Sequence, residues 1–231
     1  MKINYGFQTI ENDDIKSVIK ILKSKYLTQG PEVNKFENNL SKKLGSKYCL
    51  AVTNGTAALH LAGKALNWKK NDIVITTPIT FLSTANSILM NGASPEFIDI
   101  DKDTYTISMS ALEEKIKELK KKRKKVKSVI GVDYAGHPCD WKKLKELSKK
   151  YKFTLVNDNC HALGAKYKGD EKYAVKYADV VVQSFHPVKN ITTGEGGALL
   201  TNNYNYYKKV RTLRSHGTVR NSPWKYQMKN L

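Results

Sequence analysis

A three-layer α/β/α domain with a mostly parallel sheet is the fold that the sequence predicts. Short apolar runs of strand length alternate along the chain with longer segments whose apolar residues recur at helical spacing. This alternation is typical of a parallel sheet covered by helices on both faces. The 231 residues are enough to bury the core of one large domain, and no internal repeat interrupts the pattern.

The individual elements follow from these two periodicities. Apolar residues three and four positions apart predict helices whose inward faces lie within residues 15–22, 33–44, 59–66, 85–89, 112–119, 141–147 and 207–213. Asp13 or Asp14 is expected to cap the first helix, and Gly45 is expected to end the second. Apolar and β-branched runs predict strands over residues 48–52, 72–78, 95–100, 128–133, 154–158, 180–182 and 198–200.

Composition narrows the function classes and leaves one alternative open. The three cysteines show no metal-ligand pairing and fit a reducing cytosol. No apolar signal segment and no apolar run near the roughly 20 residues of a membrane span is visible, so a cytoplasmic protein is expected. A formal charge of +19 raises nucleic-acid binding as an alternative, best supported by the basic block Lys120–Lys125. No aromatic residue interrupts that block, which favours a solvated connection between a helix and a strand.

One lysine, Lys189, lies in a polar loop between two predicted strands, within residues 184–197. Pro187 stiffens the approach to it, and three glycines after it allow the backbone to pass close to a ligand or to take positive φ. A lysine in a loop is most often simply solvated. A lysine held between strand ends beside hydroxyl side chains can instead act as a Schiff-base amine, since lysine loses its charge readily when desolvated.

A strand, a glycine-containing turn and a helix start occur together at residues 48–58 and make a candidate anion site. The free N–H groups and the dipole of a helix start favour a phosphate, although many α/β turns have this form without binding one. Phe81 follows the strand over residues 72–78, and it either joins the core or presents its flat face to a ligand ring.

Asp158 and His161 form a second chemical centre at the end of the strand over residues 154–158. In a parallel sheet this end opens toward the same edge as Lys189, where α/β folds bind ligands. Asp158 can alternatively be the N-cap of a following helix. His137 stands between a glycine and a proline and is expected to be a loop residue.

These motifs together resemble the DegT/DnrJ/EryC1/StrS family, the pyridoxal-phosphate (PLP) dependent aminotransferases that act on nucleotide-linked keto sugars. The serine, the lysine and the Thr-Gly-Glu-Gly-Gly run of residues 184–197 all fall at the family's spacing. The resemblance implies the large domain of fold type I, with Lys189 bonded to the cofactor. It further implies these cofactor contacts: Thr56, the backbone of Ala57 and Ser184 with the phosphate, Phe81 with the pyridine ring, Asp158 with its nitrogen, and His161 with the ring or its 3-oxygen.

The resemblance also implies a substrate site. Tyr5 and a loop before the second helix match positions that approach the sugar nucleotide, and this loop consists of Leu27, Thr28, Gln29 and Gly30. Thr56 and Ser184 are assigned to the substrate as well. The lysine loop and the run Tyr134–Pro138 look most like the pseudaminic-acid branch of the family. That branch implies L-glutamate as amino donor, a UDP-linked 4-keto-6-deoxy-N-acetylhexosamine as acceptor, and a homodimer with a shared active site.

The sequence departs from the family in two respects. The family often has Glu directly before the cofactor aspartate, and Asn157 stands there in this chain. The resemblance covers only the large domain, with a helical segment over about residues 1–45, and a smaller C-terminal domain is expected to be missing. An aminotransferase for another keto sugar, such as a GDP-linked perosamine precursor, stays open. So does a function of another class, a non-catalytic PLP-binding regulator or nucleic-acid binder. Related dehydratases have histidine in place of the lysine, so Lys189 argues against that chemistry.

Overall fold

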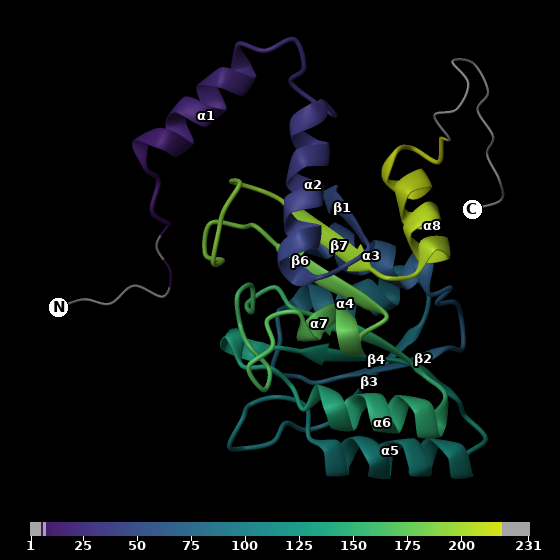
Figure 1. Ribbon diagram of the computed structural model, residues 1–231. Coiled ribbons are helices and arrows are strands. Elements are labelled where there is room, and N and C mark those ends of the chain that lie inside the picture. Colours follow the sequence, from purple (N-terminus) through teal and green to yellow (C-terminus); the bar gives the residue numbers. More distant parts are fainter. Residues whose placement is uncertain (1–5, 7, 219–231) are drawn as a thin grey trace.

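A computed structural model describes Gly6 and residues 8–218 of the chain. Its centre is a seven-stranded sheet with the order β1-β7-β6-β5-β4-β2-β3 (Figure 1). The strands are β1 (Tyr48–Val52), β2 (Ile73–Thr76), β3 (Ser94–Phe97), β4 (Val126–Val132), β5 (Thr154–Asp158), β6 (Val180–Ser184) and β7 (Gly197–Thr201). Only β7 runs against its neighbours, so the prediction of a mostly parallel sheet is confirmed.

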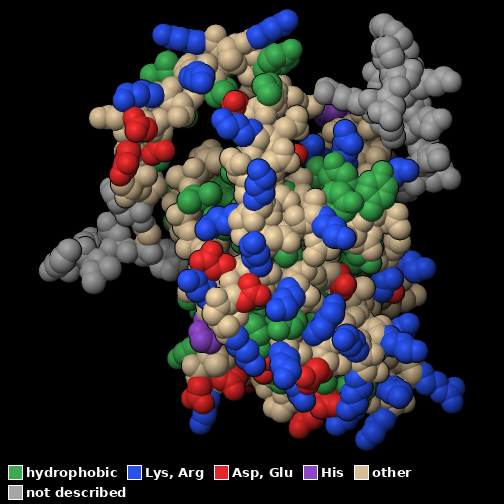
Figure 2. Space-filling model, viewed as in Figure 1, with side chains coloured by type: hydrophobic (Ala, Val, Ile, Leu, Met, Phe, Trp, Pro, Cys, Tyr) green, Lys and Arg blue, Asp and Glu red, His purple; other side chains and the backbone are tan. Residues whose placement is uncertain are grey.

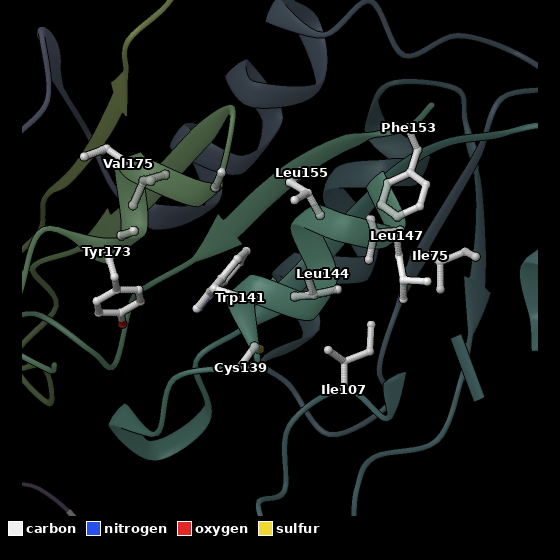
Figure 3. Close-up of a cluster of buried hydrophobic side chains, with 14 of the residues drawn as sticks. Ile75, Ile107, Cys139, Trp141, Leu144, Leu147, Phe153, Leu155, Tyr173 and Val175 are labelled. Atoms are coloured by element: carbon white, nitrogen blue, oxygen red, sulfur yellow. The ribbon is translucent and has the colours of Figure 1, made fainter. Parts of the chain in front are cut away.

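Helices cover both faces of this sheet. They are α1 (Asn12–Leu22), α2 (Pro31–Leu44), α3 (Gly55–Ala65), α4 (Leu82–Met90), α5 (Met109–Lys121), α6 (Trp141–Tyr151), α7 (Tyr173–Tyr177) and α8 (Tyr204–Arg214), with a short 3-10 turn at Tyr134–Gly136. One buried cluster packs α2, α5, α6 and α7 on the first face, and Figure 3 shows part of it. A second cluster packs α3, α4 and α8 on the other face. The three-layer prediction is therefore confirmed.

Strand periodicity explains the two clusters. Successive side chains of a strand point to opposite faces, so Leu155 of β5 lies in the first cluster and Val156 in the second. The same alternation separates Val181 from Val182 on β6. The same alternation therefore tells which face of the sheet a polar side chain at the end of a strand points to.

Helix α1 differs from the other helices because none of its residues is buried. Its apolar side chains Ile15, Val18, Ile19 and Leu22 are between 44% and 65% exposed. Glu11 is the residue that caps it, and Asp14 accepts a hydrogen bond from the Glu11 amide at 2.9 Å. The expectation of Asp13 or Asp14 as the cap is wrong, because the helix begins two or three residues earlier.

One helix was not predicted, and one predicted helix end is confirmed. The sequence pattern gave no sign of α7, which is only five residues long. The second helix ends at Gly45 as predicted, with φ of +72°. None of the helices in the described part of the chain is long and apolar enough to cross a bilayer.

Candidate active site

The candidate site lies at the carboxyl end of β5 and β6. These strands are parallel neighbours, so Asp158 and Ser184, the last residues of each, reach the same edge of the sheet. Asp158 is two residues after Val156, and Ser184 is two residues after Val182, so each points to the same face of the sheet as that valine. Both side chains therefore point to the face covered by α3 and α4. The amino ends of α3 and α4 therefore complete the edge at which these two residues lie.

The Asp158 carboxylate is held by α4. Asp158 is only 6% exposed, and the hydroxyl of the fully buried Thr84 donates to its Oδ2 at 2.7 Å. A hydrogen bond from a hydroxyl to a carboxylate is among the stronger ones in proteins. Asp158 is also the last residue of a strand rather than the N-cap of a helix, so the alternative interpretation of this residue is wrong.

Phe81 stands one turn before Thr84, as the residue that begins α4. The Thr84 amide donates to the Phe81 carbonyl at 3.0 Å, which closes the first turn of α4. The ring is 69% exposed, so Phe81 does not belong to the core. A large aromatic side chain exposed at the start of the helix that holds Asp158 is available for a flat ligand ring.

His161 accepts a hydrogen bond from the turn after β4, which leaves its other ring nitrogen as the donor. The Ala135 amide donates to its Nδ1 at 3.3 Å, so the ring proton is on Nε2. Burial lowers the pKa of His161, and the nearby charge of Lys189 lowers it further, while Asp158 acts in the opposite direction. Asp158, His161 and Lys189 all lie at or just after the carboxyl ends of the parallel neighbours β5 and β6, which places them at the same edge of the sheet. His137 is an exposed loop residue, as predicted.

Lys189 is half-buried in the loop between β6 and β7. The backbone of this loop is closed by hydrogen bonds from Phe185 to Gly196 at 2.8 Å and from Thr193 to Phe185 at 3.0 Å. Val188 contacts Gly6, since a Cβ built on Gly6 would lie 3.1 Å from the Val188 Cβ. Gly6 therefore lies beside the lysine loop.

The start of α3 packs directly against the end of β6. A Cβ on Gly55 would lie 3.0 Å from the Ser184 Cβ and 3.3 Å from the Cys160 sulfur, so only glycine leaves this approach undisturbed. Thr56 follows in the first turn of α3 and is half-buried. The helix start and the serine side chain thus lie together in one corner, and free N–H groups at a helix start favour an anion.

One expected contact in this corner is already engaged. The Ala57 amide donates to the Asn54 side chain, the N-cap of α3, at 2.8 Å. A phosphate can use this amide only if Asn54 releases it. The cofactor role of the Ala57 backbone therefore stays a prediction, and the roles of Thr56 and Ser184 do so too.

The residues of this edge fit PLP on three observations. Gly55 makes the corner between α3 and Ser184 close enough for a phosphate cradle. Asp158 has a carboxylate oriented by Thr84, as needed to hold a pyridinium nitrogen. Phe81 exposes its ring at the start of α4, the helix whose Thr84 holds that carboxylate.

The predicted substrate loop lies apart from this edge. Figure 1 shows that residues 27–30 join α1 to α2 at one end of the molecule. Leu27 is 64% exposed, and in the described part of the chain no hydrogen bond links this loop to Lys189. Tyr5 lies outside the described residues. The roles of Leu27, Thr28, Gln29, Gly30 and Tyr5 in substrate binding therefore stay predictions.

Two residues that sequence reasoning missed support the site. Thr84 holds Asp158, and its only sequence signal is a hydroxyl on the inward face of an apolar helix. Asp133 is fully buried at the end of β4 and contacts both neighbours of Asp158. The sequence could have indicated Asp133 as a site residue, because its carboxylate directly follows a buried strand.

A hollow of about 550 Å³ lies elsewhere, between the loop before α5 and residues 166–168. It is lined by Asp101, His137 and Tyr167 among others, and by none of the residues assigned to the cofactor. The chemistry of the sheet edge, rather than this hollow, therefore identifies the candidate site.

Comparison with known proteins identifies the class to which this fold and edge belong. Residues 8–231 match the model of the DegT/DnrJ/EryC1/StrS aminotransferase family. The chain belongs to this family, as the sequence motifs predicted. The seven-stranded sheet matches solved structures of that family's fold.

Two curated relatives are similar over almost the whole chain. The UDP-4-amino-4,6-dideoxy-N-acetyl-beta-L-altrosamine transaminase of Campylobacter jejuni is 42% identical over 229 residues, which is 99% of this chain and 59% of the relative. The uncharacterized protein MJ1066 of Methanocaldococcus jannaschii is 42% identical over 216 residues, 94% of this chain and 54% of the relative. The chain thus spans little more than half the length of these relatives.

Solved structures give the same relationship. Helicobacter pylori PseC, an aminotransferase involved in the biosynthesis of pseudoaminic acid, superimposes with a TM-score of 0.89 at 33% identity, covering 100% of this chain and 60% of PseC. The PLP form of the sugar aminotransferase Spr1654 from Streptococcus pneumoniae superimposes with a TM-score of 0.87 at 30% identity, covering 100% of this chain and 62% of that one.

Proposed function

We propose that this chain is the cofactor-binding part of a PLP-dependent aminotransferase that moves an amino group from L-glutamate to C4 of a UDP-linked 4-keto-6-deoxy-N-acetylhexosamine. The observation that carries the proposal is that Asp158, His161 and Lys189 lie at or just after the carboxyl ends of two parallel neighbouring strands, at one edge of the sheet. Membership of the aminotransferase family supports the reaction class. The names of the Campylobacter and Helicobacter relatives support the sugar.

Each residue of the edge has a chemical task in this proposal. PLP, when bound, supplies an electron sink next to the carbon that gains or loses the amino group. Lys189 would hold the cofactor, and its amine would move a proton to and from the sugar C4 as a general acid and base. Asp158 would keep the pyridine nitrogen protonated, while Thr84 holds its carboxylate in place. His161 would donate from Nε2 to the 3-oxygen of the cofactor, because its Nδ1 accepts from the Ala135 amide.

We also propose that the protein forms a homodimer, and exposed apolar side chains support this. Apolar side chains are exposed on α4 and on the edge strand β3: Leu82, Leu89, Met90 and Phe97 are between 47% and 68% exposed. Exposed apolar side chains that gather in one patch are typical of a surface that another chain covers. Cytoplasmic location is also proposed, since Cys49, Cys139 and Cys160 are all free thiols.

The basic block supports the alternative of nucleic-acid binding less well. Lys120–Lys125 lie at the end of α5 and in the turn that leads into the start of β4. Because β4 and β6 run in the same direction, this turn is at the opposite edge of the sheet from Lys189. Acidic side chains are interspersed among the lysines on the face shown in Figure 2, and Lys122 pairs with Glu118.

The test is a two-substrate assay with L-glutamate. Purified protein is incubated with PLP and either the UDP-linked 4-keto sugar or a GDP-linked 4-keto sugar, and the 4-amino product is measured by mass spectrometry. A second sample carries the C-terminal segment of the Campylobacter relative, because that relative is longer than this chain. Amination of the UDP sugar supports the proposal, amination of the GDP sugar alone favours the alternative sugar, and no amination in either sample contradicts an aminotransferase function.

A further inference from the structure

Asp133 is a fully buried carboxylate at the end of β4 that has no role in the chemistry described so far. The two carboxylate oxygens of Asp133 accept five hydrogen bonds, which are between 2.7 and 3.0 Å long. The donors are the Cys139 amide and the Trp141 indole N–H to Oδ1, and the Asn157 amide, the Asn159 amide and the Tyr173 hydroxyl to Oδ2. Cys139, Trp141 and Tyr173 are among the buried side chains drawn in Figure 3.

Two of these donors flank Asp158 in the chain. Asn157 and Asn159 have the opposite strand parity to Asp158, so they point to the face covered by α6 and α7 while Asp158 points to α4. The backbone is held at the same place. The Asp133 amide donates to the Asp158 carbonyl at 3.1 Å, and the Asn159 amide donates to Val182 at 3.0 Å. Asp133 therefore holds the segment that carries Asp158 from behind.

The hydrogen bonds fit an ionised Asp133. All five partners donate, so neither oxygen needs a proton of its own. Burial raises the pKa of Asp133, and the hydrogen bonds from Cys139, Tyr173, Asn159 and Trp141 oppose that rise. The second hydrogen of the Asn159 amide goes to the Tyr173 hydroxyl at 2.9 Å, while its oxygen accepts from Gln183. The orientation of Asn159 is thus fixed on every side.

We propose that Asp133 is a positioning residue for the cofactor site: by holding Asn157 and Asn159 it fixes the direction in which Asp158 and His161 point. This inference rests on the proposed PLP chemistry. It also explains why Asn157 suits this chain where the resembled family often has Glu. A Glu at this position would put a second carboxylate beside Asp133, about 3 Å away in a buried site, where two like charges repel strongly.

The experiment uses Asp133→Asn and Asn157→Leu in the whole chain. Asn157→Leu is the milder change, because the Asn157 side-chain oxygen is buried without a partner and only the bond to Asp133 is lost. Asp179→Asn is the matched control, since Asp179 accepts from the Leu155 amide at 2.7 Å at the other end of β5. The double variant Asp133→Asn with Asn157→Asp exchanges the carboxylate and the amide of this hydrogen-bonded pair, and it tests whether a restored bond between the two positions recovers the wild-type behaviour.

Two readouts separate positioning from general stability. Hydrogen–deuterium exchange of residues 157–162 in the cofactor-free protein should become about tenfold faster in both variants, the size expected for losing one buried hydrogen-bond partner. The PLP dissociation constant, from absorbance titration, should rise by about the same factor. Asp179→Asn should leave both values at wild-type levels, and the double variant should recover part of each.

Unchanged exchange at residues 157–162 would overturn the inference, as would equal effects in Asp179→Asn. An unchanged PLP dissociation constant alongside faster exchange would overturn the link to the cofactor site. If the wild-type protein binds no PLP, the proposed function fails, and the exchange result still decides whether Asp133 holds this segment. The two failures are therefore distinguishable.

Discussion

Replacing Thr84 by valine removes the hydroxyl that donates to Asp158 and keeps the shape of the side chain. The hydroxyl lies 2.7 Å from the Asp158 oxygen, and both residues are buried. A hydrogen bond to a charged group contributes about 1.5–3 kcal/mol. The free energy of unfolding should fall by about that amount, and the melting temperature by about 3–12 °C for a domain of this length.

Thr76→Val is the matched control. Thr76 is equally buried, and its hydroxyl donates to a neutral carbonyl, that of Ile130, at 3.3 Å. A neutral bond contributes about 0.5–1.5 kcal/mol, so Thr84→Val should be the more destabilising by about 1 kcal/mol. Urea denaturation measures both values. PLP titration should show about tenfold weaker binding for Thr84→Val alone. Equal stabilities of the two variants together with unchanged PLP binding would refute the reasoning.

Three further predictions follow from the site. Gly197→Ala should unfold the protein or lower its melting temperature strongly in a circular-dichroism melt, because the new Cβ would lie 2.4 Å from the Asn54 carbonyl carbon; a wild-type melt contradicts this. The folded-state pKa of His161 is lowered, so its contribution to stability is present above pH 6.5 and lost as pH falls. Lys189→Ala should raise that pKa in an NMR titration, and an unchanged midpoint would exclude the charge coupling. Neutralising Lys120–Lys125 should leave PLP binding unchanged, and a loss would link the block to the site.

Much of the fold could be predicted because it depends on local periodicity. The apolar runs at 154–158 and 180–182 become the buried strands β5 and β6, and the glycine at 45 ends α2 as expected. The antiparallel direction of β7 was not predicted, because it depends on the path of the lysine loop. The short helix α7 left no periodic signal over its five residues.

The candidate site was predictable to the extent that its residues lie at strand ends. Asp158 and Ser184 were expected at one edge because parallel strands end together. Thr84 and Asp133 were missed because each acts through a contact with residues far along the chain, 74 positions apart in the case of Thr84 and Asp158. Phe81 could be assigned to the core or to a ligand from the sequence; its exposure of 69% excludes the core, and its contact with the cofactor ring stays a prediction.

The central claim is that Lys189 is the residue that bonds PLP. The measurement is an absorption spectrum of the chain with PLP, for wild type and Lys189→Ala, followed by borohydride reduction and peptide mass spectrometry. A visible band is expected in the wild type, with a phosphopyridoxyl mass fixed on Lys189 after reduction, and neither is expected in the variant. A band of equal strength in both proteins, or reduction onto another lysine, would contradict it. The same measurement on a chain extended by the C-terminal segment of the Campylobacter relative should give the same modified lysine, and absence of the band there too would contradict PLP chemistry at this site.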